Sequence, residues 1–249
     1  VSSSFLLSFS SFAQLGNVDS SLSYAVKFLN TIPEASRESA YNSIASQLAE
    51  NKLALDIAKS YINKAVASAR VNKSRALPVF LNTQASVYFN IGKIDSALVI
   101  QKEALASNDK NAGYLISLAT YEEASGNRAA ALRTISKSIL MGRNDKAINY
   151  FTLWLEKENT DISDRNKLKE NISKEIVDEY LKSDNSERAK SNAAAYLASL
   201  KIDLQMAEKL AKEAAININD KTSVDDIVFI RTNAALVFSA LGDLKNSLN

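Results

Sequence analysis

The strongest constraint in this sequence is an internal repeat with a period of 34 residues. Two segments, 81–105 and 115–139, share identical residues at this offset, four of which mark the unit. The pairs are Leu81 and Leu115, Ala85 and Ala119, Gly92 and Gly126, and Ala97 and Ala131. Another copy begins near Ala235, at an offset of 150, and a block around Leu48 recurs around Leu197 at an offset of 149. We expect similar units stacked on one another, because one short unit cannot bury its own apolar face.

The repeated residues describe two helices joined by a tight turn. Ala85 and Ala97 are small enough to let two helices approach closely. Gly92 can adopt the left-handed conformation that ends a helix. Asn127, directly after a repeated glycine, can cap the helix that follows. The predicted unit is therefore an antiparallel helix hairpin.

Composition favours an all-α fold and excludes several kinds of chemistry. The 249 residues include 6 Gly and 2 Pro, too few for the many turns of a β-sandwich. The sequence has no Cys and no His, so the chain itself offers no disulfide, zinc-thiolate site or His-based catalytic triad. A formal net charge of +2 argues against general nucleic-acid binding, which needs a basic face.

Around Gly92 the sequence resembles the tetratricopeptide repeat (TPR) family. The family pattern of a small residue, an aromatic residue, glycine and alanine reads here as Ala85, Tyr88, Gly92 and Ala97. The later copies read Ala119, Glu122, Gly126 and Ala131, and then Ala235, Phe238, Gly242 and Ser247. Glu122 departs from the aromatic position. The resemblance implies an all-α, right-handed α-solenoid of stacked antiparallel helix hairpins.

The periodicity and the breaker residues predict where the helices lie. Helices are expected over 18–31, 34–50, 54–70, 77–90, 94–107, 111–124, 128–141, 145–157, 163–183, 187–199, 203–216, 227–240 and from 243 onward. TPR-like hairpins are predicted over 14–142 and again over 187–249. Residues 143–186 are predicted to form one degenerate hairpin or a helical spacer, with Trp154 in its core. We expect the parent protein to continue beyond Asn249, because a solenoid normally finishes with a polar capping helix.

The first residues differ from the rest of the chain. Residues 1–13 read VSSSFLLSFSSFA, with no charge and no pattern that favours a helix, and end in Ala13 before Gln14. This composition is typical of the end of a secretory signal peptide. It predicts a periplasmic or secreted protein, with a cytoplasmic protein as the alternative. No stretch reaches the roughly 20 apolar residues that span a bilayer, so no stable membrane insertion is expected.

The TPR resemblance also implies a binding face. In that family, the first helix of each hairpin lines a concave surface. Carried over to this sequence, the positions that point inward are Asn82, Ser86, Phe89, Ile116, Thr120 and Glu123. This surface is neutral and would suit an extended peptide, a helix or another domain of the same chain. Neither catalytic residues nor a cofactor or metal site are predicted.

The predicted function is non-catalytic protein–protein interaction or scaffolding within an exported bacterial TPR protein. The alternative is the helical N-terminal region of a thioredoxin-like thiol–disulfide reductase, or of a periplasmic-sensing kinase, whose catalytic domain lies beyond residue 249. An enzyme built on a helical scaffold is the competing class. It would need convergent polar groups, and the predicted face offers only Glu123 and small hydroxyls.

Overall fold

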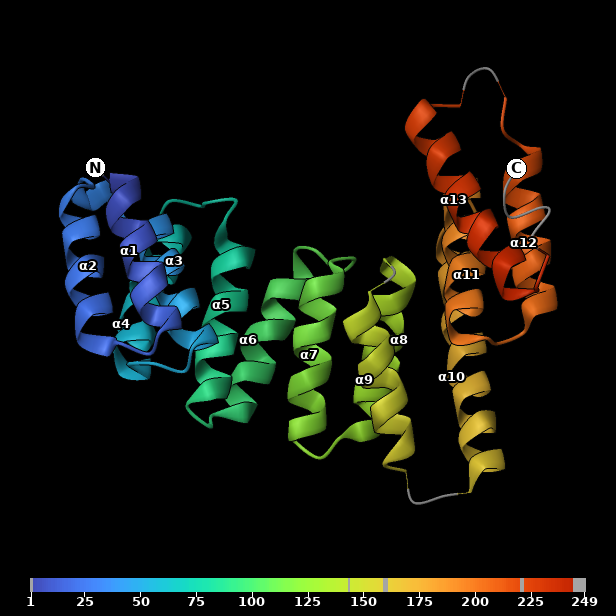
Figure 1. Ribbon diagram of the computed structural model, residues 1–249, viewed down its shortest axis with the longest axis horizontal. Coiled ribbons are helices and arrows are strands. Elements are labelled where there is room, and N and C mark those ends of the chain that lie inside the picture. The colour runs from blue at the N-terminus through green and yellow to red at the C-terminus, as the bar shows by residue number, and fades with distance from the viewer. Residues whose placement is uncertain (1, 143, 159–160, 220–221, 244–249) are drawn as a thin grey trace. The chain divides into compact units, whose positions relative to one another are not determined.

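The structure is a computed structural model that describes residues 2–142, 144–158, 161–219 and 222–243. These residues form thirteen α-helices and one short 3-10 helix, and they contain no strand (Figure 1). The elements are α1 (Ser2–Gln14), α2 (Val18–Asn30), η1 (Glu34–Ser36), α3 (Glu38–Glu50), α4 (Leu55–Val71), α5 (Leu77–Asn90), α6 (Ile94–Ala106), α7 (Ala112–Ala124), α8 (Arg128–Met141), α9 (Asp145–Glu156), α10 (Ile162–Ser183), α11 (Glu187–Leu200), α12 (Leu204–Ile216) and α13 (Val224–Ala240). The prediction of an all-α chain is confirmed for the described residues.

Most predicted helices agree with the observed ones to within a few residues at each end. The range 34–50 divides into η1 and α3, because Arg37 separates them. The helix expected at 227–240 starts earlier, because the Ser223 hydroxyl accepts the backbone N–H of Asp226 at 3.1 Å and caps α13. The helix predicted from 243 onward falls almost wholly outside the described residues.

One expectation about local structure is wrong. Residues 1–13 were predicted to lack a helical pattern, yet α1 runs from Ser2 to Gln14. Phe9 and Ala13 are buried on its inner side. Phe12 stacks on Tyr24 of α2, with ring centroids 5.5 Å apart. The first helix therefore packs against the second as a hairpin.

The same backbone turn ends the first helix of several hairpins. After α5, the N–H of Gly92 donates to Phe89 and the N–H of Lys93 donates to Tyr88, both at 2.9 Å. This bonding is the Schellman motif, which requires a left-handed residue after the helix. Matching hydrogen bonds follow α1, α3, α11 and α13, where the left-handed residues are Gly16, Lys52, Lys201 and Gly242. The predicted role of the repeated glycines is confirmed, and lysine takes it after α3 and after α11.

The first compact unit comprises Val1–Asp109 and Thr120–Gly126. In it α1 pairs with α2, α3 with α4, and α5 with α6. Ala85 of α5 and Ala97 of α6 are fully buried in one cluster with Tyr121. Alanine at this crossing leaves room for the two helix backbones to approach, as the sequence predicts.

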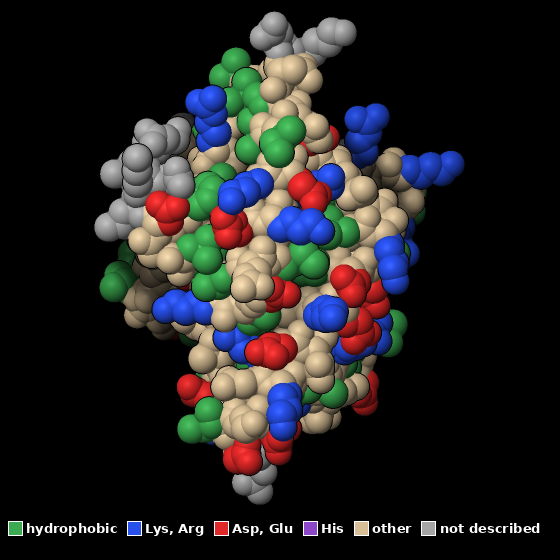
Figure 2. All heavy atoms as spheres, turned by 90° about the vertical axis from the view of Figure 1, so that its right-hand side faces the viewer, with side chains coloured by type: hydrophobic (Ala, Val, Ile, Leu, Met, Phe, Trp, Pro, Cys, Tyr) green, Lys and Arg blue, Asp and Glu red, His purple; other side chains and the backbone are tan. Residues whose placement is uncertain are grey.

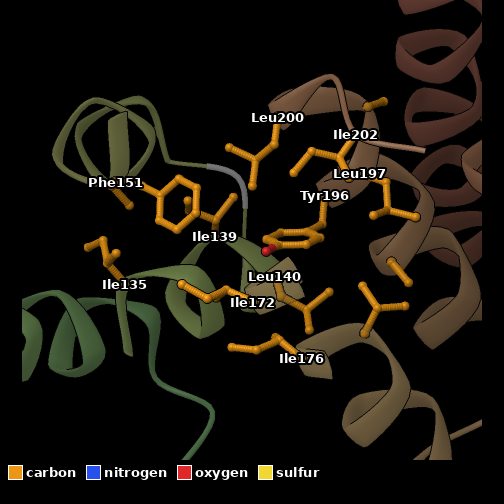
Figure 3. Packing of buried hydrophobic residues seen from close by; sticks show 14 of the residues in the cluster. Ile135, Ile139, Leu140, Phe151, Ile172, Ile176, Tyr196, Leu197, Leu200 and Ile202 are labelled. Atoms are coloured by element: carbon orange, nitrogen blue, oxygen red, sulfur yellow. The ribbon is translucent and has the colours of Figure 1, made fainter. Parts of the chain in front are cut away.

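The second compact unit comprises Lys110–Ala119 and Asn127–Asn249. In it α11 pairs with α12, and α13 packs against both. Figure 3 shows the Tyr196 ring of α11 among apolar side chains of α8 and α10, including Ile139, Leu140, Ile172 and Ile176. Three helices from separate parts of this unit therefore share one core.

The helices α8 and α10 are also joined at their surface. Arg133 pairs with Glu175, and one helical turn further on Lys137 pairs with Glu179 at 3.4 Å. Both partners advance by four residues in the same chain direction, so the two helices run parallel. These ion pairs therefore attach α10, which belongs to the middle segment, directly to α8.

The middle segment differs from the hairpins around it. The helix α9 packs chiefly against α8, whereas α10 packs against α8 and α11 more than against α9. The end of α9 at Lys157 is right-handed and lacks the left-handed turn of the other first helices. Trp154 is 4% exposed and stacks on Tyr150, which confirms its predicted place in the core. The division of the sequence at 142 and 186 stays a prediction.

Candidate functional site

Two of the six predicted binding residues have partners inside the first unit. The Asn82 side-chain oxygen accepts a hydrogen bond from the Gln101 amide of α6 at 3.0 Å. The Phe89 ring stacks on Tyr121, with centroids 4.7 Å apart. Both side chains therefore help to hold neighbouring helices together.

The other four predicted residues are half-buried. Ser86 lies on α5, and Thr120 and Glu123 lie on the part of α7 that belongs to the first unit. Ile116 belongs to the second unit. Their role in binding stays a prediction.

Positions in the second unit that correspond to the predicted binding positions can be found by counting back from its left-handed turn residues. Asn82 and Ser86 lie 10 and 6 residues before Gly92, and Val79, one turn before Asn82 on the same face of α5, lies 13 residues before it. Counting the same distances back from Lys201 leads to Arg188, Ser191 and Ala195 on α11, and from Gly242 to Phe229, Thr232 and Leu236 on α13. Sequence reasoning missed the α11 positions because lysine, not glycine, marks the turn there.

Four of these residues line one pocket of about 590 Å³ between α11, α13 and the end of α8. We call it the α11–α13 pocket. Its lining consists of Ile139, Leu140, Met141, Gly142, Arg188, Asn192, Ala195, Tyr196, Ser199, Asp225, Val228, Phe229, Thr232 and Asn233. Val228 is 58% exposed at its rim. A pocket of this size accommodates a few side chains.

Arg188 lines one wall of the pocket and is paired with Asp226, which lies outside the lining. The Arg188 guanidinium donates to Asp226 at 2.6 Å and lies 4.0 Å from the centroid of the Phe229 ring. Asp226 also accepts the Ser223 hydroxyl at 2.7 Å. These hydrogen bonds, that of Ser223 first and that of Arg188 second, hold the pKa of Asp226 below its ordinary value. Arg188 is thus neutralised by a neighbour on α13.

Polar side chains from α11 and α13 line part of the pocket. The Asn192 amide donates to the Tyr180 hydroxyl at 3.3 Å, and the Asn233 amide donates to Ser191 at 3.0 Å. The Ser199 hydroxyl oxygen is buried and has no hydrogen-bond partner among the described residues. A buried hydroxyl without a partner is destabilising, so this group favours a ligand that can bond to it.

A buried hydrogen-bond network supports the floor. The Tyr196 hydroxyl bonds to Ser136 of α8, and it donates to Ser173 of α10 at 2.8 Å. Both serines are fully buried, and the Tyr196 ring is 1% exposed. Burial raises the pKa of Tyr196, although the bonds to Ser136 and Ser173 act in the opposite direction. The Tyr196 hydroxyl is therefore uncharged and hydrogen-bonded at neutral pH, and its bonds hold the Tyr196 ring in place at the floor of the pocket.

The arrangement suits binding by contact and hydrogen bonding. Among the described residues, the only ionisable side chains in the lining are Arg188, Tyr196 and Asp225. Arg188 and Tyr196 have intramolecular partners. Across the described ranges there is no group of three Asp, Glu, His or Cys side chains placed to hold a metal ion. No helix within those ranges is long and apolar enough to cross a membrane.

The surface on the side of α12 and α13 is mixed in charge. Figure 2 shows basic and acidic side chains interspersed there with apolar ones. Ion pairs on α12 include Lys212 with Glu208 at 2.5 Å, and Glu213 also pairs with the largely buried Lys190 of α11 at 3.3 Å. The residues that line the pocket, rather than a large surface patch of one charge, therefore distinguish it from the surface around it.

The fold defines an all-α protein of stacked helix hairpins, and structural comparison finds similarity to TPR-repeat proteins. No protein-family model and no curated protein matches the sequence. One similar structure is a protein of Podosopora anserina described as a kinesin light chain with nearly identical TPR-like repeats. It has 13% identity and a TM-score of 0.39, over 87% of this chain and 92% of that one.

Two further structures are similar. The TPR2AB domain of yeast Sti1, in complex with an Hsp90 peptide, has 16% identity and a TM-score of 0.42, over 99% of this chain and 89% of that one. The TPR domain of P58(IPK) has 12% identity and a TM-score of 0.30, over 100% of this chain and 81% of that one.

Proposed function

We propose that this chain is a non-catalytic protein-interaction module and that the α11–α13 pocket is its binding site. The proposal rests on one observation: residues at corresponding positions of the repeated helices α11 and α13 line the same pocket. These residues are Arg188, Ala195, Phe229 and Thr232. Apolar side chains provide contact area, and side-chain amides provide hydrogen bonds. A segment of a partner protein needs both.

The test measures binding of a varied panel of short fluorescent peptides to the whole 249-residue chain by anisotropy. We expect some peptides to bind with dissociation constants of about 1–100 μM. Thr232→Trp places a large ring in the pocket from an exposed position, and it should abolish that binding. Val224→Trp is the matched control, because Val224 is 74% exposed on the same helix and outside the lining. Binding that survives Thr232→Trp contradicts the proposal.

We also propose that the module acts on proteins rather than nucleic acids, in a periplasmic or secreted protein. The near-neutral net charge supports the choice of partner, and the composition of residues 1–13 supports export. Cleavage after Ala13 would remove α1, whose Phe9 is fully buried. Mass spectrometry of the native protein tests this, since a polypeptide that keeps residues 1–13 is not processed there.

Attachment to a reductase or kinase domain is a further proposal that rests on the resemblance to exported TPR proteins. Sequencing the complete reading frame tests it directly. A Cys-x-x-Cys motif downstream supports the reductase, and a histidine-kinase segment supports the sensor. A stop codon soon after Asn249 contradicts both.

A further inference from the structure

We infer that the α11–α13 pocket binds an extended peptide segment in which an aliphatic residue is followed by lysine or arginine. The inference rests on the proposed function and adds the chemistry of the partner. It depends on three properties of the pocket: an apolar floor, an uncompensated carboxylate at the rim, and hydrogen-bonding groups between them.

The apolar part accepts an aliphatic side chain. Leu140 and Tyr196 form a buried base, while Met141 and Phe229 are half-buried and Val228 is exposed at the rim. A side chain inserted here covers apolar surface that is otherwise in contact with water. A charged side chain would lose its hydration at the same position without gaining a partner.

The rim has an excess of negative charge. Arg188 is paired with Asp226, so these two charges compensate each other. The neighbouring Asp225 is exposed and forms no ion pair among the described residues. Among the described residues, one positive and two negative groups leave a local charge of −1, which favours a basic residue and disfavours a carboxylate.

The hydrogen-bonding groups suit a peptide backbone. The buried hydroxyl of Ser199 lacks a partner within the described part of the chain, and the amides of Asn192 and Asn233 lie along the same lining. An extended backbone presents N–H and C=O groups in alternation, so it can supply both the donor and the acceptor that such side chains need. A purely apolar ligand would leave Ser199 unsatisfied.

The experiment compares three synthetic peptides that differ only at two central residues: Leu-Lys, Leu-Glu and Ser-Lys. Affinity for the whole chain is measured by anisotropy at low and at high salt. We expect Leu-Lys to bind about fivefold more tightly than Leu-Glu at low salt, because rim charges interact weakly in water. The preference should shrink at high salt. Ser-Lys should bind at least tenfold more weakly than Leu-Lys, since it lacks the apolar side chain.

Charge variants locate the selectivity. Asp225→Asn should remove the preference for Leu-Lys over Leu-Glu and leave the preference for Leu over Ser. Asp178→Asn makes the same charge change on the exposed face of α10, away from this lining, and should leave both preferences intact.

Three outcomes distinguish the two proposals. If Leu-Glu binds as tightly as Leu-Lys while Thr232→Trp still abolishes binding, the inference about partner chemistry is overturned and the proposed binding site stands. An Asp178→Asn effect equal to that of Asp225→Asn also overturns the inference, because general charge would then explain the selectivity. If Thr232→Trp leaves binding unchanged, both proposals fail.

Discussion

Replacing Tyr196 by phenylalanine isolates the contribution of the buried network in the second unit. The substitution keeps the ring among its apolar neighbours and removes only the hydroxyl. Two hydrogen bonds are lost, one to Ser136 and one to Ser173. Both serines are fully buried, so water cannot replace the missing partner.

The expected loss of stability on Tyr196→Phe follows from these two hydrogen bonds. Each buried hydrogen bond contributes about 0.5–1.5 kcal/mol net, and a buried hydroxyl left without a partner costs about 1–3 kcal/mol. Serine in a helix can turn its hydroxyl to a carbonyl one turn earlier, which recovers part of this cost. We therefore expect Tyr196→Phe to lower the free energy of unfolding by about 2 kcal/mol. The triple variant that also carries Ser136→Ala and Ser173→Ala should be less destabilised than the separate losses add up to, because no unsatisfied hydroxyl remains.

Trp154 provides the assay. It is the only tryptophan, and it lies in the same core cluster as Tyr196. Its fluorescence during urea unfolding therefore reports the second unit. Tyr24→Phe in the first unit is the control, because the Tyr24 hydroxyl forms no hydrogen bond with the described residues, and it should leave the transition in place. A Tyr196→Phe transition that coincides with wild type would refute the reasoning.

Three further predictions concern other parts of the chain. Phe9→Ala should destabilise by about 3–5 kcal/mol because Phe9 is fully buried, whereas Leu7→Ala, at 69% exposure on the same helix, should change stability by less than about 0.5 kcal/mol, as measured by denaturation followed by circular dichroism. Ala97→Leu should destabilise by about 1–3 kcal/mol through overpacking, and Val99→Leu at an exposed site of α6 should not; equal melting temperatures for both would count against the helix crossing. Asp226 has a lowered folded-state pKa, so its stabilising effect is present above its unfolded value of about 3.9 and is lost as the pH falls through the folded value. Asp226→Asn should therefore weaken the acid dependence of unfolding, and identical pH profiles for variant and wild type would exclude this contribution.

The hairpins were predictable where local signals agreed. Around α5 and α6, the glycine turn, the alanine crossing and Pro78 in the first helical turn all indicate the same boundaries. The cap at Asn127 was predictable for the same reason, and its side chain accepts the N–H of Ala130 at 3.2 Å. Each of these signals depends only on residues close in the chain, so sequence alone contains them.

The first helix was missed because its serines obscure its pattern. Phe5, Phe9 and Phe12 are spaced four and three residues apart, which is helical spacing. Serine normally disfavours a helix interior because its hydroxyl competes for backbone groups. Here Ser10 and Ser11 donate to the carbonyls four residues earlier, at 2.9 and 3.0 Å, so that competition is satisfied inside the helix.

The candidate pocket could not be derived from the sequence alone. Its wall depends on Arg188 meeting Asp226, residues 38 positions apart, and its floor depends on Tyr196 reaching Ser136, 60 positions away. Such distant pairings follow from how α8, α11 and α13 pack. The repeat register identifies which side of α11 and α13 lines the pocket, but only after Lys201 is recognised as a turn residue.

The lysines in the left-handed turns also bear on how such a chain can be recognised from sequence. Lys52 and Lys201 adopt φ values of 54° and 53°, close to those that glycine provides elsewhere, although a side chain makes this conformation less favourable by about 1–2 kcal/mol. A search pattern that demands glycine scores both hairpins as mismatches while their backbone bonding is preserved. The turn geometry is therefore the same at these positions although the residue differs. Repeats of this kind are therefore better recognised by their pattern of backbone hydrogen bonds than by the residues at their turns.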